Sequence, residues 1–474
     1  MLRSLLPSFI ADCVFPDHKQ TWKVHPTSYL DGLRGIASVI VFFCHYTEEN
    51  FRPLTRAYGV DDDGLSGWIQ LPFVRMIFSG RPMVHIFFVI SGFVLSYKPI
   101  KAIHARDLDK CYTALASSTF RRAFRLFGPC VASTFIIMVL CQLGYLYHPH
   151  TSWSAQFWNW ENVMFHQLTW PWEWDHDLRP GYDIHLWTIP IEFAHSMLLF
   201  MVILMFSRVR LRIRQAMVFG LMVYCLTCGK WAGFEFLAGL FLAEVHILQS
   251  AQPKDWESSD PIYHQEKWSA ISTVKPLLHL FLVILGLFIG GWPNNDADKT
   301  SGIRYFLEQT PMPFAKMDKL APQKFWFGLS AVFTVWSVGE LPFLKRFFEG
   351  SLAQYCGRVS YAVYICHGPV LGYFQKRVLG ADYIPATGEP GTPDFKQAIA
   401  AAGIKGILGA TTVTQKTMSW FVGLCILGPI VIWVADIFWR AIDNPVVSIG
   451  RKFENACLDD TEPSPRAMGY SPAA

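Results

Sequence analysis

The first long hydrophobic stretch, residues 31–49, predicts a membrane-spanning helix that carries three ionisable residues. Asp31 and Arg34 lie near its start, and His45 lies deep inside it. Arg34 and His45 are eleven residues apart, which places them within roughly 20° of one helix face and about 16 Å apart along the axis. Ionisable groups at membrane depth are expensive and are seldom kept without a task. This face therefore offers a fixed cation near one membrane surface and an imidazole, able to act as a general base, inside the span.

A second set of cations, Arg121, Arg122 and Arg125, lies where the third hydrophobic stretch begins. Their i,i+3 and i,i+4 spacings place them on one helical face. Converging guanidinium groups suit a phosphate-rich ligand, because each one binds phosphate oxygens in a planar fork. The alternative is a purely topological role, since basic residues gather at the cytosolic ends of membrane helices.

A carboxylate, Glu192, stands inside an apolar predicted helix whose entry is bent by Pro190. An unpaired carboxylate at that depth is costly, so we expect Glu192 to be neutral or paired with a histidine or an arginine. Both a structural ion pair and a catalytic role are consistent with the sequence.

Two further polar residues are candidates for substrate binding or for a structural role. Ser91, next to Gly92, is small enough for a ligand or a neighbouring helix to approach closely. His367 shortly precedes Pro369, so its imidazole either binds substrate or satisfies a carbonyl that the proline frees. No zinc-ligand spacing, phosphate-binding glycine loop or nucleophile elbow occurs, so we expect no metal; nothing in the sequence predicts nucleic-acid binding.

The composition indicates the kind of element that positions these residues. Of the 474 residues, 52% are hydrophobic and only 16% are charged, against about 25% charged in soluble domains. We therefore expect an all-α integral membrane protein, a bundle of about ten transmembrane helices in the lipid bilayer. The expected spans are residues 31–49, 82–98, 127–147, 185–206, 214–229, 231–248, 276–293, 325–342, 358–377 and 418–440.

Basic residues cluster in the connections after the second, fourth and eighth expected spans. With ten spans these three connections fall on one side, and the positive-inside rule then places both termini in the cytosol of an endomembrane or plasma-membrane protein. We expect a cytosolic tail over residues 1–28, one membrane domain over 29–450, and a disordered cytosolic tail over 451–474.

The loop over residues 148–184, on the opposite side, is rich in tryptophan. It predicts either an interfacial aromatic belt or a stacking platform for an apolar or sugar-like molecule.

Five motifs together make the chain resemble the acyltransferase 3 family of multi-spanning membrane acyltransferases. They occur in the family's order: Leu30–Ala37 followed by His45, Phe87–Phe93, Arg122-Ala-Phe-Arg125, Leu186–Glu192 and Ser360–His367. The resemblance implies transfer of an acyl group, often acetyl, from a coenzyme A thioester to a hydroxyl of a glycan, lipid or small metabolite. It also implies that His45 is the essential histidine and that Arg34, Arg122 and Arg125 help to hold acyl-CoA.

The fourth-span motif departs from the family pattern, in which a second acidic residue and a Phe-Tyr pair often follow the glutamate. Here Phe193, Ala194 and His195 follow Glu192, which leaves the acceptor open between a small molecule and a glycan.

Physical and family arguments converge on one hypothesis. The phosphates of acyl-CoA lie on Arg121, Arg122 and Arg125, and His45 takes the proton of the acceptor hydroxyl. Glu192 or Asp31 orients a cation. The rival hypothesis is a transporter or flippase for a polar metabolite, because proton-coupled carriers also need buried ionisable groups; the lack of a detectable inverted repeat weakens it.

Overall fold

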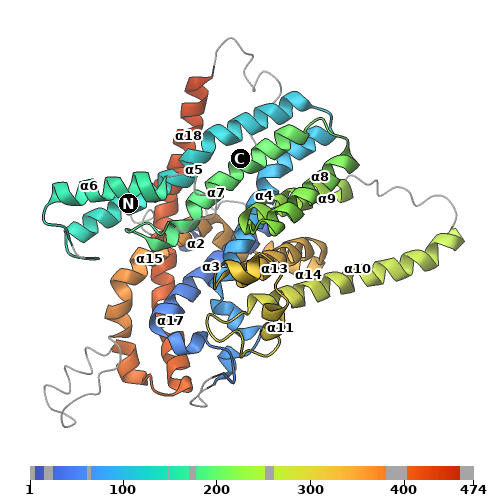
Figure 1. Cartoon of the computed structure of the whole chain (residues 1–474). Coiled ribbons are helices and arrows are strands. Elements are labelled where there is room, and N and C mark those ends of the chain that lie inside the picture. Colours follow the sequence, from blue (N-terminus) through green and yellow to red (C-terminus); the bar gives the residue numbers. More distant parts are fainter. Residues whose placement is uncertain are drawn as a thin grey trace, which may run out of the picture.

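The computed structural model describes residues 6–14, 25–60, 66–147, 149–169, 178–250, 261–380 and 403–458. Over these residues every regular element is a helix and no strand is present, which confirms the all-α class (Figure 1).

Every expected span coincides with a long helix. The helices are α3 (Ser28–Asn50), α4 (Gly80–His104), α5 (Leu108–Gln142), α7 (Thr188–Phe206), α8 (Leu211–Thr227), α9 (Trp231–Ser250), α10 (Pro261–Gly290), α13 (Ala321–Glu340), α15 (Ser351–Leu379) and α17 (Val413–Phe438). Short elements join them, among them α6 (Trp153–Val163), the 3-10 turn η6 (Ile184–Trp187) and α14 (Pro342–Phe348).

Fewer helices than ten are long and apolar enough to cross a membrane. Among the described residues five pass on length and composition: α4, α5, α9 and the segments Ile184–Phe206 and Val413–Cys457. The pair α13 and α14, bent by 97°, brings the number to six. These helices fit a multi-pass membrane protein, whereas the count of ten is not confirmed. Two causes of the shortfall are plain: α3 carries Asp31, Arg34, Glu48 and Glu49, and α8 has 17 residues.

The third helix begins earlier than the sequence predicts. The expected span starts at residue 127, but α5 starts at Leu108 and has 35 residues. Near its middle, at residues 120–128, α5 packs against α18 (Asn444–Cys457), which crosses it (Figure 1). The ring of Phe453 stacks 5.8 Å from that of Phe120, and Glu454 forms an ion pair with Arg121 at 3.0 Å.

These contacts also correct the expected tails. The tail expected from residue 451 is helical as far as Cys457, because α18 packs on α5; residues 459–474 lie outside the described residues. At the other end, α2 (Ser8–Val14) is held to the bundle where the Ser8 hydroxyl donates to Asp436 at 2.6 Å.

Glycines let α3 and α15 pack with their backbones in contact. A Cβ on Gly35 would lie 2.2 Å from the backbone nitrogen of Gly357, and a Cβ on Gly357 would lie 2.4 Å from the carbonyl oxygen of Asp31. Small residues at helix contacts are the usual way for membrane helices to approach this closely. The same device joins α4 to α9, where a Cβ on Gly92 would lie 2.3 Å from the carbonyl oxygen of Phe236.

The first prediction concerns the contact between α3 and α15. Gly35→Ala should lower the stability of the folded protein by about 1–3 kcal/mol, because the new methyl group meets backbone that cannot move aside. The matched control is Gly220→Ala on α8, where a Cβ has no neighbour within 4 Å and the substitution should leave stability unchanged or raise it. Thermal unfolding of both variants in detergent measures the difference; equal melting temperatures would show that the two helices separate without penalty.

Candidate active site

Helices α3 and α15 run parallel and hold two of the predicted motifs side by side. At one end the guanidinium of Arg34 donates to the Gly357 carbonyl and to the Ser360 hydroxyl, both at 3.1 Å. At the other end the rings of His45 and His367 stack with their centroids 5.2 Å apart. The residue numbers increase in the same direction along both helices, so the register set at Arg34 also brings His45 to His367. The Asp31 carboxylate forms an ion pair with the Arg34 guanidinium, with an N···O distance of 3.1 Å.

A third histidine completes a cluster with these two. His185, on η6, has its ring centroid 4.1 Å from that of His45 and 4.6 Å from that of His367. One ring nitrogen from each residue lies within 4.8 Å of the other two. We call His45, His185 and His367 the histidine cluster. Three converging imidazoles are also a donor set that Zn²⁺ accepts, so a site without metal stays a prediction.

Partners of the ring nitrogens fix how two of these imidazoles face the cluster. Nδ1 of His185 lies 2.8 Å from Oδ1 of Asp183, which also accepts from the His185 backbone N–H at 3.0 Å. Nδ1 of His367 lies 3.1 Å from the Val363 carbonyl, and its buried Nε2 has no hydrogen-bond partner in the part of the chain that the structure describes. The sequence argument missed Asp183 and His185 as site residues; their position directly before the Leu186–Glu192 motif was the available signal.

The exposed side of His45 faces acidic and basic groups. Its Nδ1 lies 3.9 Å from Glu48 one turn further along α3. Glu48 in turn lies 3.9 Å from Arg81 at the start of α4 and accepts from Asn294 at 2.5 Å.

Glu192 is paired with an arginine inside the bundle. Arg122 on α5 donates to its carboxylate at 2.8 Å and to the Ser196 hydroxyl at 2.9 Å. Ser91 on α4 donates to the same carboxylate oxygen at 3.0 Å. The structure thus brings three of the predicted residues together, and this network satisfies a carboxylate that would otherwise be costly to bury.

The three arginines of α5 have different surroundings. Arg121 points to Glu454 of α18, and Arg122 is engaged by Glu192. Arg125 lies within electrostatic range of Arg34, Arg122, Glu192 and Asp443. Within the described part of the chain it has no hydrogen-bond or ion-pair partner, and its side chain is exposed. Arg34, Arg122 and Arg125 therefore form one basic group, with Arg121 at its edge.

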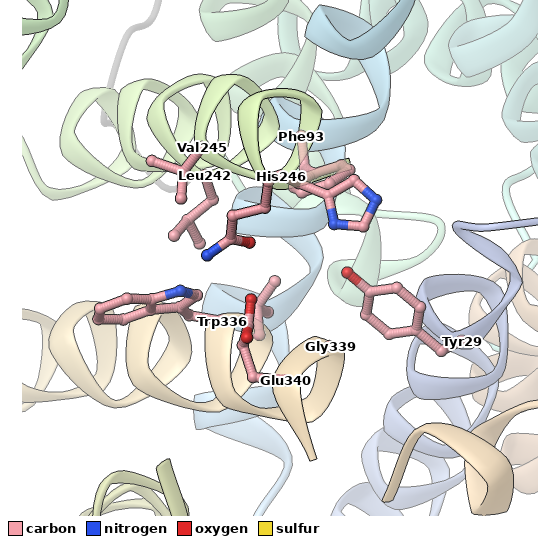
Figure 2. A pocket seen from close by; sticks show the side chains of 10 residues that line it. Tyr29, Phe93, Leu242, Val245, His246, Trp336, Gly339 and Glu340 are labelled. Atoms are coloured by element: carbon pink, nitrogen blue, oxygen red, sulfur yellow. The ribbon is translucent and has the colours of Figure 1, made fainter. Parts of the chain in front are cut away.

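A small cavity elsewhere in the bundle is not part of this arrangement. Figure 2 shows its lining by Tyr29 of α3, Phe93 of α4, His246 of α9, and Trp336 and Glu340 of α13. Its volume of about 10 Å³ suits a single water molecule rather than a substrate, and no member of the histidine cluster lines it.

A helical bundle that holds a basic group and a histidine cluster fits the expected class of membrane acyltransferases, and comparison with known sequences agrees. The model of the acyltransferase 3 family, described as an acyltransferase domain, matches residues 27–440. The chain belongs to this family of acyltransferases.

Curated relatives come from fungi. The chain is 32% identical over 409 residues to the O-acetyltransferase PaAT-1 of Phomopsis amygdali, an alignment that covers 79% of this chain and 78% of the relative. It is 26% identical to the acyltransferase R4 of a Phoma species and 25% identical to the acyltransferase clz18 of Cochliobolus lunatus, with 72% of this chain and 82% of the relative covered in each case. No solved structure gives a significant match.

The second prediction separates the ion pair from its single members. Arg122→Met should destabilise the protein by about 3–5 kcal/mol, because it leaves the Glu192 carboxylate buried without its cation. The double variant Arg122→Met/Glu192→Gln should recover a large part of that loss, since a neutral amide still accepts from Ser91. Melting temperatures of the wild type, both single variants and the double variant complete the cycle. Additive losses would show that the two side chains stabilise the bundle independently.

Proposed function

We propose that this chain is a membrane-embedded O-acyltransferase that moves an acyl group, most simply acetyl, from acyl-CoA to a hydroxyl of a small metabolite or glycan. The observation that carries the proposal is the parallel pairing of α3 with α15. It holds a basic group at the Arg34 end and the histidine cluster about 16 Å further along the same helix face. The name of the relative PaAT-1, an O-acetyltransferase, supports acetyl as the group transferred.

The basic group is the proposed site for the phosphates of coenzyme A. Arg125 supports this role best, because it is an exposed guanidinium without a partner among the described residues, next to two further arginines. Arg34 and Arg122 keep part of their fork in contact with protein oxygens and add positive charge. Arg121 contributes at the rim, where Glu454 now holds it. The pantetheine arm then extends along α3 and α15 toward the histidines.

His45 is the proposed general base. It accepts the proton of the acceptor hydroxyl as the hydroxyl oxygen attacks the carbonyl carbon of the thioester. A carbon–oxygen bond forms, the carbon–sulfur bond breaks, and coenzyme A leaves as the thiolate, which takes the proton from His45. No metal ion takes part in these proposed reaction steps.

The remaining predicted site residues position the arginines or contact the acceptor. Glu192 and Ser91 position Arg122, and Asp31 positions Arg34, as their hydrogen bonds and ion pairs support. His367 offers an unpartnered nitrogen beside His45 and is the proposed contact of the acceptor.

We further propose that all ten long helices cross the bilayer, with both termini in the cytosol of an endomembrane or plasma-membrane protein. The basic loops on one side support this topology. Helices such as α3 then cross because their charged side chains face protein partners rather than lipid. The basic group lies on the cytosolic side and the histidine cluster lies in the opposite half.

The third prediction tests the histidine. His45→Ala should lower the release of free coenzyme A from radiolabelled acetyl-CoA by about 100-fold or more, because the attacking hydroxyl loses its base. The assay uses the full-length protein in nanodiscs, with benzyl alcohol as the acceptor. The control is His279→Ala, since His279 is also buried but bonds to Ser337 away from the cluster. Turnover that survives His45→Ala would remove this residue from the mechanism. Transport of an intact solute without thioester cleavage would favour the carrier hypothesis.

The fourth prediction tests the donor site. Arg125→Gln should weaken acetyl-CoA binding by about tenfold or more, because one charge-assisted contact to phosphate is lost. The rate at saturating donor should change little. The matched control is Arg304→Gln, which removes a surface arginine paired with Glu308 outside the bundle core. Calorimetric titration with acetyl-CoA measures the affinity; equal affinities for both variants would return Arg125 to a topological role.

A further inference from the structure

Asp183 and His185 form a hydrogen-bonded pair beside the proposed base. What we infer from this pair rests on the proposed function. The pair is buried, with Asp183 3% and His185 9% exposed. The carboxylate binds both the ring Nδ1 and the backbone N–H of His185. The carbonyl of His185 accepts from the Tyr364 hydroxyl, which also bonds to Thr188 at 2.7 Å. Ring and backbone of His185 are therefore both held in place.

The facing helix leaves a space for this pair. A Cβ on Gly368 of α15 would lie 2.6 Å from Nδ1 of His185 and 3.1 Å from Oδ1 of Asp183. No residue other than glycine leaves that hydrogen bond undisturbed. Since Gly368 directly follows His367, the same turn of α15 accommodates the pair and supplies a member of the histidine cluster.

Hydrogen bonding determines what the two imidazoles present to the cluster. A carboxylate only accepts, so Nδ1 of His185 carries a hydrogen, and in the neutral ring Nε2 carries a lone pair. A carbonyl also only accepts, so the same holds for His367, whose buried Nε2 has no partner within the described ranges. Two lone pairs next to each other require a hydrogen-bond donor between them. The protonated form of His45 and a substrate hydroxyl are both such donors.

The spacing of the cluster fits one oxygen atom. The three ring nitrogens lie within 4.8 Å of one another, so an oxygen equidistant from them would be about 2.8 Å or less from each, the length of a strong hydrogen bond. The cluster therefore has the dimensions of a subsite for a single hydroxyl group.

We propose that Asp183, His185 and His45 form a hydrogen-bond relay, and that the reacting hydroxyl of the acceptor binds between His45 and His367. His185 and Asp183 are positioning residues, since they act through His45. In serine hydrolases a carboxylate orients the imidazole that takes the proton; here the carboxylate of Asp183 acts on the proposed base through one additional imidazole, His185.

The relay assigns each hydrogen in the reaction. One nitrogen of His45 takes the hydroxyl proton while the carbon–oxygen bond forms. The other nitrogen donates its N–H to Nε2 of His185, whose Nδ1–H is donated to Asp183. The positive charge that develops on His45 is thereby stabilised through His185 by the carboxylate. When the carbon–sulfur bond breaks, the proton passes from His45 to the thiolate and the relay returns to its starting state.

Several charged or titratable groups face the two imidazoles of this relay, His45 and His185, and influence how they titrate. They come from three helices and the loop before η6: Glu48 and Glu49 of α3, Arg81 of α4, His367 of α15, and Asp183. Only Asp183 acts through a hydrogen bond to His185. Replacing Asp183 by a neutral isostere therefore isolates the relay from the general charge of the site.

The test follows the chemical reactivity of His45, so it does not depend on knowing the acceptor. Diethyl pyrocarbonate modifies the unprotonated imidazole, and His45 is reachable because its side chain is 30% exposed. Peptide mass spectrometry of the full-length protein in nanodiscs gives the modification rate of His45 against pH for the wild type, Asp183→Asn and His185→Gln. His279→Gln is the control for a buried histidine outside the cluster. Coenzyme A release with benzyl alcohol is measured on the same samples.

The relay predicts that Asp183→Asn moves the midpoint of the His45 reactivity curve to lower pH by on the order of one unit, because a negative charge that favoured the protonated ring is gone. His185→Gln breaks the same link and is read by turnover, because it also removes an imidazole that faces His45. Coenzyme A release should fall at least tenfold in both variants, while His279→Gln matches the wild type.

Contrary outcomes distinguish the relay from the proposed function. An unchanged midpoint in folded Asp183→Asn protein overturns the relay, whatever the turnover; wild-type turnover retained in that variant leaves the proposed function standing. No turnover in any folded sample, the wild type included, counts against the proposed function instead. Stoichiometric zinc in the purified wild type that is lost in His185→Gln, with turnover abolished by a chelator, would assign the cluster to a metal ion and also overturn the relay.

Discussion

The backbone contact between α3 and α15 is the constraint on which the rest of the site depends. Gly35 and Gly357 bring the two helix axes so close that sliding one helix past the other would drive side chains into backbone. This contact fixes the register, and because both helices are rigid the register is transmitted along their length. Arg34 is thereby placed on Gly357 and Ser360, and three turns further on His45 is placed on His367. Neither end of the site is adjustable without the other.

Ionisable side chains are tolerated in this bundle because they are grouped. Arg122 and Glu192 neutralise each other and share the hydroxyls of Ser91 and Ser196. A second group on the far side of α4 works in the same way: Arg214 and His104 both bind Glu244. Such networks seldom add net stability over an apolar core, but they are strongly destabilised by the loss of one member. Their value here is that they hold helices of different spans in a defined register.

Sequence alone was enough for the properties that follow from periodicity and composition. The eleven-residue spacing of Arg34 and His45 predicted their common face, and the lack of charged residues predicted an all-helical membrane protein. Helix ends were less predictable, since the start of α5 packs against helices distant in sequence: Cys111 and Leu115 lie in a hydrophobic cluster shared with α7, and Tyr112 bonds to Ser207. The pairing of Arg122 with Glu192 was expected only as one of several pairs. Asp183 and His185 were not identified, because their importance comes from Gly368 and the histidines of α3 and α15, which no local pattern reveals.

The groups left without partners describe the kind of molecule that fits between the two ends. At the basic end the exposed guanidinium of Arg125 has no hydrogen-bond or ion-pair partner among the described residues and lies beside two further arginines, so this end suits a negatively charged group. At the other end Nε2 of His367 has no hydrogen-bond partner among the described residues, so this end suits a hydroxyl or another donor. A single small metabolite does not meet both needs across about 16 Å of helix. The proposed acyl-CoA donor, with phosphates at its head and a reactive carbonyl at its tail, spans this distance, and the proposed acceptor hydroxyl then enters from the histidine side. The polarity of the unsatisfied groups thus favours a two-substrate transfer over the carriage of one solute.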